Sequence, residues 1–136
     1  MTPRGIRNFN PLNIKRGIAW DGLAAKQIDD TFDTFDTAVW GIRAAAKILL
    51  TYQRKHGLET VREMIDRWAP PSENDTESYI AHVARQMDVE PDEPIGNLED
   101  MPTSFAAMLE TMILHENGQQ PYPADVIVRA IDMAVA

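Results

Sequence analysis

The sequence contains no cysteine among its 136 residues. Disulfides, thiolate metal sites and a cysteine nucleophile are therefore excluded. It also lacks an apolar run near the roughly 18 residues that a membrane helix needs. The first eight residues, MTPRGIRN, have no apolar stretch of the kind found in secretory signals. We therefore expect neither a membrane span nor a secretory signal.

Basic residues are scarce as well. Lys and Arg number 13 against 21 Asp and Glu, which gives a formal net charge of −8. Nucleic-acid affinity comes mostly from basic side chains that neutralise phosphates, so we expect no nucleic-acid partner. What is present is an ordinary globular composition, with 44% hydrophobic and 25% charged residues. At this length it predicts a single domain, residues 1–136, that needs no disulfide or metal.

Residues 1–36 show little helical periodicity. Glycine, proline, asparagine and aspartate interrupt the apolar positions, which is typical of irregular structure. We expect an irregular N-terminal arm, with a short β-hairpin that pairs Leu12–Ile14 with a segment near Phe32–Phe35.

Helical patterning begins near Thr37 and predicts about five helices, so the fold class is mainly α. Thr37 is a suitable N-cap, and Gly57 is a natural stop. Apolar residues recur at helical spacing in further segments. The predicted helices cover 37–57, 58–68, about 76–87, 103–116 and 124–133. Between 37–87 and 102–136, residues 88–101 form an acidic connection containing two prolines, which we interpret as a solvated loop.

The histidines and the acidic residues of the arm do not predict a metal site. No pair among His56, His82 and His115 has the i, i+4 spacing of a helical zinc site. The aspartates at 29, 30, 33 and 36 lack the D-x-D-x-D-G core and the terminal Glu of a calcium loop. We therefore expect no metal and no other cofactor.

An asparagine-rich run in the arm has two interpretations. Asn8, Asn10 and Asn13 can hydrogen-bond the backbone of tight turns and hold an irregular loop in one shape. Amides and the indole of Trp20 are also the groups that bind sugars, the amides through hydroxyls and N-acetyl groups and the ring through its flat face. Residue chemistry leaves a structural turn and a binding site both open.

Glu116 also has two interpretations. It ends an apolar helical segment just before Gly118. The negative end of the helix dipole and apolar neighbours both raise the pKa of a carboxyl group, as a general acid requires. The alternative is an exposed glutamate at a frayed helix end.

Residues 4–14, Arg-Gly-Ile-Arg-Asn-Phe-Asn-Pro-Leu-Asn-Ile, resemble the R-G-I-R-N-x-N-P-G-N-I opening of small phage and prophage proteins described as virion structural proteins. The resemblance continues through 32–37, 40–44, 67–76, Tyr79 and 115–118, which covers nearly the whole chain. The main departures are Phe9 and Leu12. Leu12 replaces the usual glycine, so a turn that tolerates positive φ is shaped differently here.

A more distant resemblance is to glucosaminidase-type peptidoglycan hydrolases of the lysozyme-like superfamily. Residues 10–15 with Trp20-Asp21-Gly22 are similar to their N-L-F-G-I-K…W-x-G segment. Their catalytic Glu ends a helix upstream of that segment, in an E-S-x-G setting, where this chain has only nine residues. Residues 109–118 resemble the missing helix, with Glu116-Asn117-Gly118 in place of E-S-x-G. These resemblances imply a circularly permuted lysozyme-like domain whose catalytic helix comes late.

This hypothesis implies a phage or prophage protein that binds, and as an enzyme cleaves, peptidoglycan as a glycoside hydrolase or lytic transglycosylase. Glu116 is the expected catalytic acid, and candidates for a second carboxylate are Asp30, Asp36 and Glu73. The expected substrate-binding residues are Asn8, Asn10, Asn13, Trp20, Phe35, Glu73, Asn74 and Tyr79. Because the chain is acidic overall, binding to the anionic wall must come from a shaped sugar cleft rather than from net charge.

Two other functions remain open. One is a non-catalytic virion structural protein on the same scaffold, in which Glu116 only stabilises the fold. The other is an interaction module that uses the acidic surface. The expected partners are cell-wall glycan and other virion proteins. The expected location is the virion, or the bacterial cytoplasm before release, with action at the bacterial envelope if the protein is an enzyme.

Overall fold

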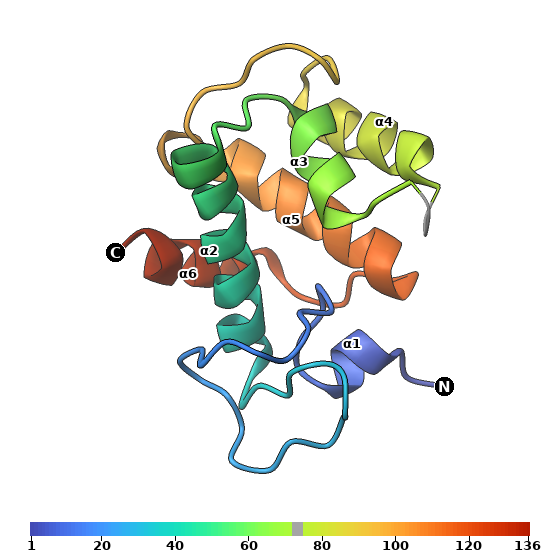
Figure 1. Cartoon of the computed structure of the whole chain (residues 1–136), viewed down its shortest axis with the longest axis vertical. Coiled ribbons are helices and arrows are strands. Elements are labelled where there is room, and N and C mark those ends of the chain that lie inside the picture. The colour runs from blue at the N-terminus through green and yellow to red at the C-terminus, as the bar shows by residue number, and fades with distance from the viewer. Residues whose placement is uncertain (72–74) are drawn as a thin grey trace.

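The computed structural model of the chain describes residues 1–71 and 75–136 and is mainly helical, as predicted. In these two ranges the chain forms six α-helices and one 3-10 helix (Figure 1). No sheet forms in the described part, where pairing is limited to isolated β-bridges. The elements are α1 (Arg4–Arg7), α2 (Ala38–His56), α3 (Val61–Trp68), α4 (Thr76–Met87), η1 (Leu98–Asp100), α5 (Pro102–Asn117) and α6 (Ala124–Val135).

Local capping explains where α2 and α3 begin and end. Gly57 ends α2 in the left-handed conformation, at φ 63°, as predicted. Thr37 occupies the N-cap position of α2, but its side chain makes no capping hydrogen bond, so that expectation is wrong. α3 begins at Val61 rather than at 58, because Thr60 and Glu63 form a capping box that fixes the first turn there.

The apolar core surrounds α5, which runs through the middle of the molecule (Figure 1). Helix α4 packs against α5, and α6 packs against both α5 and α2. The α5 side chains that face these neighbours are fully buried, including Phe105, Met108, Leu109 and Met112. Burial of such side chains supplies most of the favourable free energy of folding. The late position of α5 in the chain therefore does not make it peripheral.

The acidic connection over 88–101 is only partly the solvated loop that was predicted. Most of its acidic side chains are exposed, but Leu98 in η1 is fully buried. The Arg54 guanidinium lies 2.9 Å from the Glu99 carboxylate, and the Ile95 amide donates to the Glu59 carbonyl. A buried leucine and contacts to neighbouring elements thus anchor the connection, a detail hidden by its charged composition.

The N-terminal arm is irregular, as predicted, and the expected hairpin forms only in part: the Asp33 amide donates to the Ile14 carbonyl at 3.0 Å, but no strands form in the described arm. Single antiparallel bridges join Lys15 to Phe32 and Leu23 to Phe35. The Asn10 side chain reinforces this limited pairing, because its Nδ2 donates to the carbonyls of Ile14 and Asp33, both at 2.9 Å. The short helix α1 is an addition that the sequence did not predict.

A close backbone contact fixes the arm against α2. A Cβ atom on Gly41 would lie 2.2 Å from the Phe9 carbonyl oxygen, so only glycine fits at this crossing. None of the described helices is both long and apolar enough to cross a membrane.

Candidate functional site

The carboxyl group of Glu116 lies where the end of α5 meets the arm. Asn13, held in a left-handed turn at φ 54°, donates from Nδ2 to Glu116 Oε1 at 3.2 Å. The Tyr79 hydroxyl, from α4, donates to Glu116 Oε2 at 3.3 Å. Three segments far apart in the sequence therefore hold one carboxyl group in place.

The surroundings of Glu116 favour its protonated form. Burial raises the pKa of Glu116, while the hydrogen bonds from Asn13 and Tyr79 and the charge of Arg4 act in the opposite direction. Burial and the neighbouring Glu116 also raise the pKa of Tyr79 far above its usual value. Tyr79 therefore stays protonated and remains a hydrogen-bond donor.

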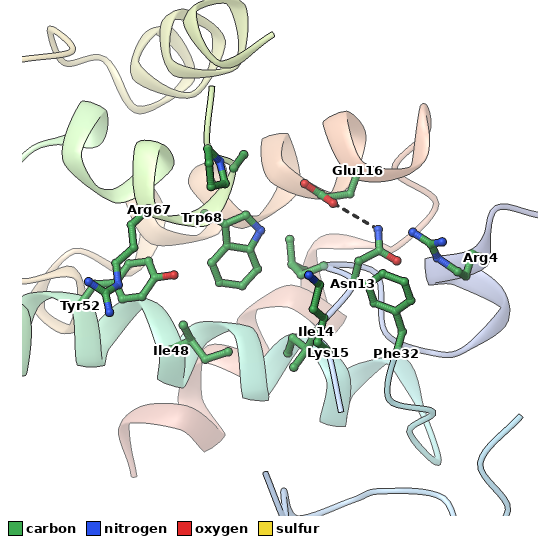
Figure 2. A pocket seen from close by; sticks show the side chains of 13 residues that line it. Arg4, Asn13, Ile14, Lys15, Phe32, Ile48, Tyr52, Arg67, Trp68 and Glu116 are labelled. Atoms are coloured by element: carbon green, nitrogen blue, oxygen red, sulfur yellow. Dashed lines mark hydrogen bonds between the residues drawn. The ribbon is translucent and has the colours of Figure 1, made fainter. Parts of the chain in front are cut away.

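Glu116 faces a groove with a volume of about 510 Å³ (Figure 2). The arm contributes Leu12, Asn13 and Ile14 to its lining, α2 contributes Ile48 and Tyr52, and α3 contributes Arg67 and Trp68. Aromatic faces and polar groups occur together there, a combination typical of ligand sites. The groove also lies beside the C-terminal end of α5, which carries the half-buried Glu116.

The structure separates the predicted substrate-binding residues into three groups. Asn13 lines the groove, and Tyr79 lies behind Glu116 with its side chain buried. Asn8, Asn10 and Phe35 are buried, and Trp20 is partly buried against the core; none of these four is part of the groove lining. Glu73 and Asn74 lie outside the described residues.

The buried asparagines shape the loop that carries Asn13. Asn8 donates to the Asp29 carboxylate at 3.3 Å, and Asn10 both donates to the Ile14 carbonyl and accepts from the Ile14 amide. These bonds match the structural interpretation of the asparagine-rich run. The side chain of Asn13 alone among these asparagines reaches the groove.

Two of the candidate second carboxylates also lie away from the groove. Asp30 and Asp36 are exposed, and neither belongs to its lining. Among the described residues that line the groove, Glu116 is the single carboxylate. The third candidate, Glu73, lies outside the described residues.

Several groove residues received no functional role from the sequence, among them Arg4, Tyr52, Arg67 and Trp68. A signal for three of them was present, since Arg4, Arg67 and Trp68 belong to the stretches that carry the phage-protein resemblance. Tyr52 was assigned only to the apolar face of a helix.

A pair of histidines lies next to the site. His82 Nδ1 and His115 Nε2 are 2.8 Å apart, and the His115 ring stacks on Tyr79 with centroids 4.4 Å apart. The two histidines come from α4 and α5, so their spacing in the sequence gave no hint of the contact. Burial and the neighbouring His82 lower the pKa of His115, while Asp75 opposes this shift. In the described ranges, no group of three or more His, Asp and Glu residues is arranged to hold a metal ion.

The fold and the groove define a class: a small, mainly helical domain with one half-buried acidic residue facing a groove. No protein-family model matches the chain. The chain is 42% identical over 133 residues to Protein P5 of Pseudoalteromonas phage PM2, covering 95% of this chain and 80% of that protein. The chain therefore belongs to the family of phage proteins that includes Protein P5.

This relationship confirms the phage assignment and supports the interpretation as a virion protein. It does not test the R-G-I-R-N opening as a family signature, or the more distant resemblance to lysozyme-like hydrolases. The role of Glu116 and of the other site residues also stays a prediction.

Proposed function

We propose that the chain is a phage virion structural protein that binds peptidoglycan glycan strands and cleaves them with Glu116 as general acid. The observation that carries this proposal is the half-buried carboxyl group of Glu116, held by Asn13 and Tyr79 and facing the groove. The protein would be located in the virion, with other virion proteins and the cell-wall glycan as partners, and would act at the bacterial envelope.

The proposed chemistry begins with Glu116 in its acid form. Burial raises the pKa of this carboxyl group, so it holds its proton at a higher pH than an exposed glutamate does. The proton passes to the glycosidic oxygen as the bond between that oxygen and the anomeric carbon breaks. The resulting carboxylate then accepts a proton from the water molecule or sugar hydroxyl that attacks the anomeric carbon. This transfer restores the acid form of Glu116.

The groove favours a route without a second protein carboxylate. Glu116 is the single acidic side chain among its described lining residues, whereas the usual pair of carboxylates flanks the scissile bond. In substrate-assisted enzymes a group of the sugar itself, such as the N-acetyl oxygen, stabilises the positive charge at the anomeric carbon. This route fits hydrolysis and lytic transglycosylation, which differ only in whether water or a hydroxyl of the same sugar attacks.

The proposed scaffold is a circularly permuted lysozyme-like domain. Two contacts support it, because the end of α5 lies beside the asparagine-rich segment that the permutation requires as its neighbour. Asn117 Nδ2 donates to the Pro11 carbonyl at 2.8 Å, and Asn13 reaches Glu116. Domain termini often lie close together at the surface, so such rearrangements are physically accessible.

A second candidate function is a virion structural protein without catalysis. The same contacts favour it, because Glu116 and Asn117 both join the arm to α5 and would stabilise the fold whether or not a substrate binds. Asn117 also stands where the enzymes have serine, and its amide is already bound to two backbone carbonyls.

The experiment that separates these functions is lysis of purified peptidoglycan, followed by turbidity over a range of pH and salt. Wild type is compared with Glu116→Gln, which keeps the shape and removes the acid. Glu110→Gln is the matched control, because Glu110 lies on the same helix but outside the groove lining. We expect lysis by wild type and Glu110→Gln and a loss of at least about 100-fold in Glu116→Gln, the usual contribution of a general acid.

Two other results would contradict the proposal in different ways. Equal lysis by wild type and Glu116→Gln would show that another group is the acid. An absence of lysis and of binding to insoluble peptidoglycan, by wild type under all conditions, would leave the purely structural function.

A further inference from the structure

The groove differs in charge from the molecule around it. The chain carries a formal charge of −8, yet the groove lining contains Arg4, Lys15 and Arg67 against the single carboxyl group of Glu116. When Glu116 holds a proton, the lining is cationic with no ionised acid among its described residues. A cationic groove in an acidic protein concentrates anionic ligands at one place.

The three cations of the groove lack a salt-bridge partner within the described residues. Three arginines outside the groove are ion-paired: Arg43 with Asp21, Arg54 with Glu99, and Arg62 with both Glu77 and Asp92. Within the described residues, no ion pair of this kind joins Arg4, Lys15 or Arg67 to a carboxylate. No carboxylate of the described residues therefore competes at salt-bridge distance for a ligand's place on these three cations.

Aromatic rings orient two of these cations. The Arg4 guanidinium lies 3.9 Å from the centroid of the Phe32 ring, and that of Arg67 lies 5.2 Å from the centroid of Tyr52. A guanidinium that lies over a ring still has N–H groups to donate, and these match the two oxygens of a carboxylate. Arg67 Nη2 also lies 3.5 Å from His56 Nε2, so one edge of this guanidinium already contacts another side chain.

Arg4 and Arg67, each of which lies over an aromatic ring, flank Glu116. In Figure 2, Arg67 with Tyr52 occupies one end of the groove and Arg4 with Phe32 the other, while Trp68 and Glu116 lie between them. A flat indole beside the acid suits an apolar sugar face, and the cations at the ends suit anionic substituents. The order of the groups along the groove thus suits a polymer with carboxylates along its length.

We propose that the groove selects a glycan that bears carboxylates, such as one carrying lactyl or peptide carboxyl groups, and that Arg4 and Arg67 bind those carboxylates on either side of Glu116. This inference rests on the proposed function as a glycan-cleaving protein and narrows its substrate class. Neutral glycans of the same length fit the aromatic part of the groove but leave both guanidinium groups without a partner.

Binding of defined oligosaccharides tests this selectivity apart from cleavage. The titrations use full-length Glu116→Gln, so that no substrate is consumed, and three tetrasaccharides of equal length. The first is an N-acetylglucosamine–N-acetylmuramic acid tetrasaccharide with free lactyl carboxylates. The second is the same compound with those carboxylates amidated, and the third is neutral chitotetraose. We expect the first to bind about tenfold more tightly than the other two, and this preference to shrink as salt rises.

Arginine variants in the same background locate the preference. Arg4→Gln and Arg67→Gln should each lower affinity for the carboxylated sugar about threefold, the size expected for a solvent-exposed ion pair. Both should leave the affinity for chitotetraose unchanged. Arg54→Gln is the matched control, since Arg54 is paired with Glu99 and lies outside the groove lining. Circular dichroism spectra and thermal midpoints confirm that each variant is folded.

The outcomes separate the two proposals. Equal affinity for the carboxylated and amidated sugars, or an equal loss for all three sugars in the arginine variants, would overturn the selectivity while lysis by wild type upheld the general-acid function. No binding of any sugar together with no lysis by wild type would overturn the proposed function and the selectivity with it.

Discussion

The arm and the helical part of the chain are held together by different forces. In the helical part, large apolar side chains such as Phe105 and Leu109 are fully buried against other helices. In the arm, Leu12 and Phe35 also enter the core, but many polar side chains bind backbone groups as well: Asn10 spans two segments, and Gln27 both donates to and accepts from Thr34. Apolar burial tolerates small shifts, whereas hydrogen bonds fix a backbone at defined atoms.

This difference explains where the candidate site lies. Glu116 belongs to the end of a helix anchored by the apolar core, and Asn13 belongs to a loop anchored by hydrogen bonds. The groove opens along the boundary between the two regions, so each region positions one wall. A change that weakens one region should therefore affect the groove in a way that depends on which region is changed.

The largest effect is expected from the core. Replacing Phe105 with alanine should lower the free energy of unfolding by about 3–5 kcal/mol, because a fully buried aromatic ring is lost and a cavity is left. Both regions should then unfold in a single transition at lower urea, followed by far-UV circular dichroism. Leu114→Ala is the control on the same helix, since Leu114 is exposed, and should change stability by less than about 0.5 kcal/mol. A small change in the free energy of unfolding of Phe105→Ala would contradict this expectation and show that the core tolerates the loss of the ring.

A smaller and more local effect is expected from the arm. Asn10→Ala removes a side chain with two donated bonds and one accepted bond. It leaves the Ile14 amide and the Asp33 carbonyl without these partners, while the Ile14 carbonyl still accepts from the Asp33 amide. We expect a loss of about 1–3 kcal/mol, with earlier proteolytic cleavage within 1–36 than in the helices. The exposed Asn97, which makes no capping bond, provides the control Asn97→Ala. Cleavage of helices and arm at the same rate would contradict the division into two regions.

The smallest effect is expected at the boundary and depends on pH. The pKa of Glu116 is raised in the folded state, so its favourable contribution is complete below the unfolded value of about 4.5 and is lost as pH rises through the folded pKa. Glu116→Gln, which cannot ionise, should therefore gain stability relative to wild type between pH 4 and pH 8. The gain should stay below about 1 kcal/mol, since solvent screens a half-exposed charge.

Thermal midpoints of wild type and Glu116→Gln at several pH values give this comparison. A variant that is equally destabilised at pH 4 and pH 8 would show that Glu116 contributes a structural bond rather than the cost of a buried charge. Glu110→Gln, on the same helix, should show no such trend.

The helices could be predicted from the sequence because their signals are local. Apolar spacing located α2, α5 and α6, and Gly57 and Gly118 both end helices in the left-handed conformation. The start of α3 was predicted at residue 58 instead of Val61, because the weak helical pattern at 58–60 does not indicate the capping box formed by Thr60 and Glu63. The hairpin was right only in part: the Ile14 and Asp33 backbones do pair, but side-chain bonds from Asn10 take the place of a longer strand ladder, and alternation of residues does not reveal this.

The site was predictable in part. Glu116 stood out by its place between an apolar segment and a glycine, and the structure brings Asn13 and Tyr79 to it. The groove cations Arg4 and Arg67 could not be assigned, because they lie 63 positions apart in the printed sequence and only the tertiary fold brings them to one surface. The same holds for His82 and His115, which belong to different helices.

The bond between Asn13 and Glu116 joins residues 103 positions apart, and this separation governs when the site forms during synthesis. A ribosome-bound chain that has completed α4 already contains the whole arm. It still lacks Glu116, the residue whose carboxyl group Asn13 binds in the finished fold. The groove is closed only after α5 leaves the exit tunnel and docks in the core. Prematurely terminated chains that stop before α5 therefore lack the carboxyl group altogether, so the producing cell encounters the assembled site only in chains synthesised through α5.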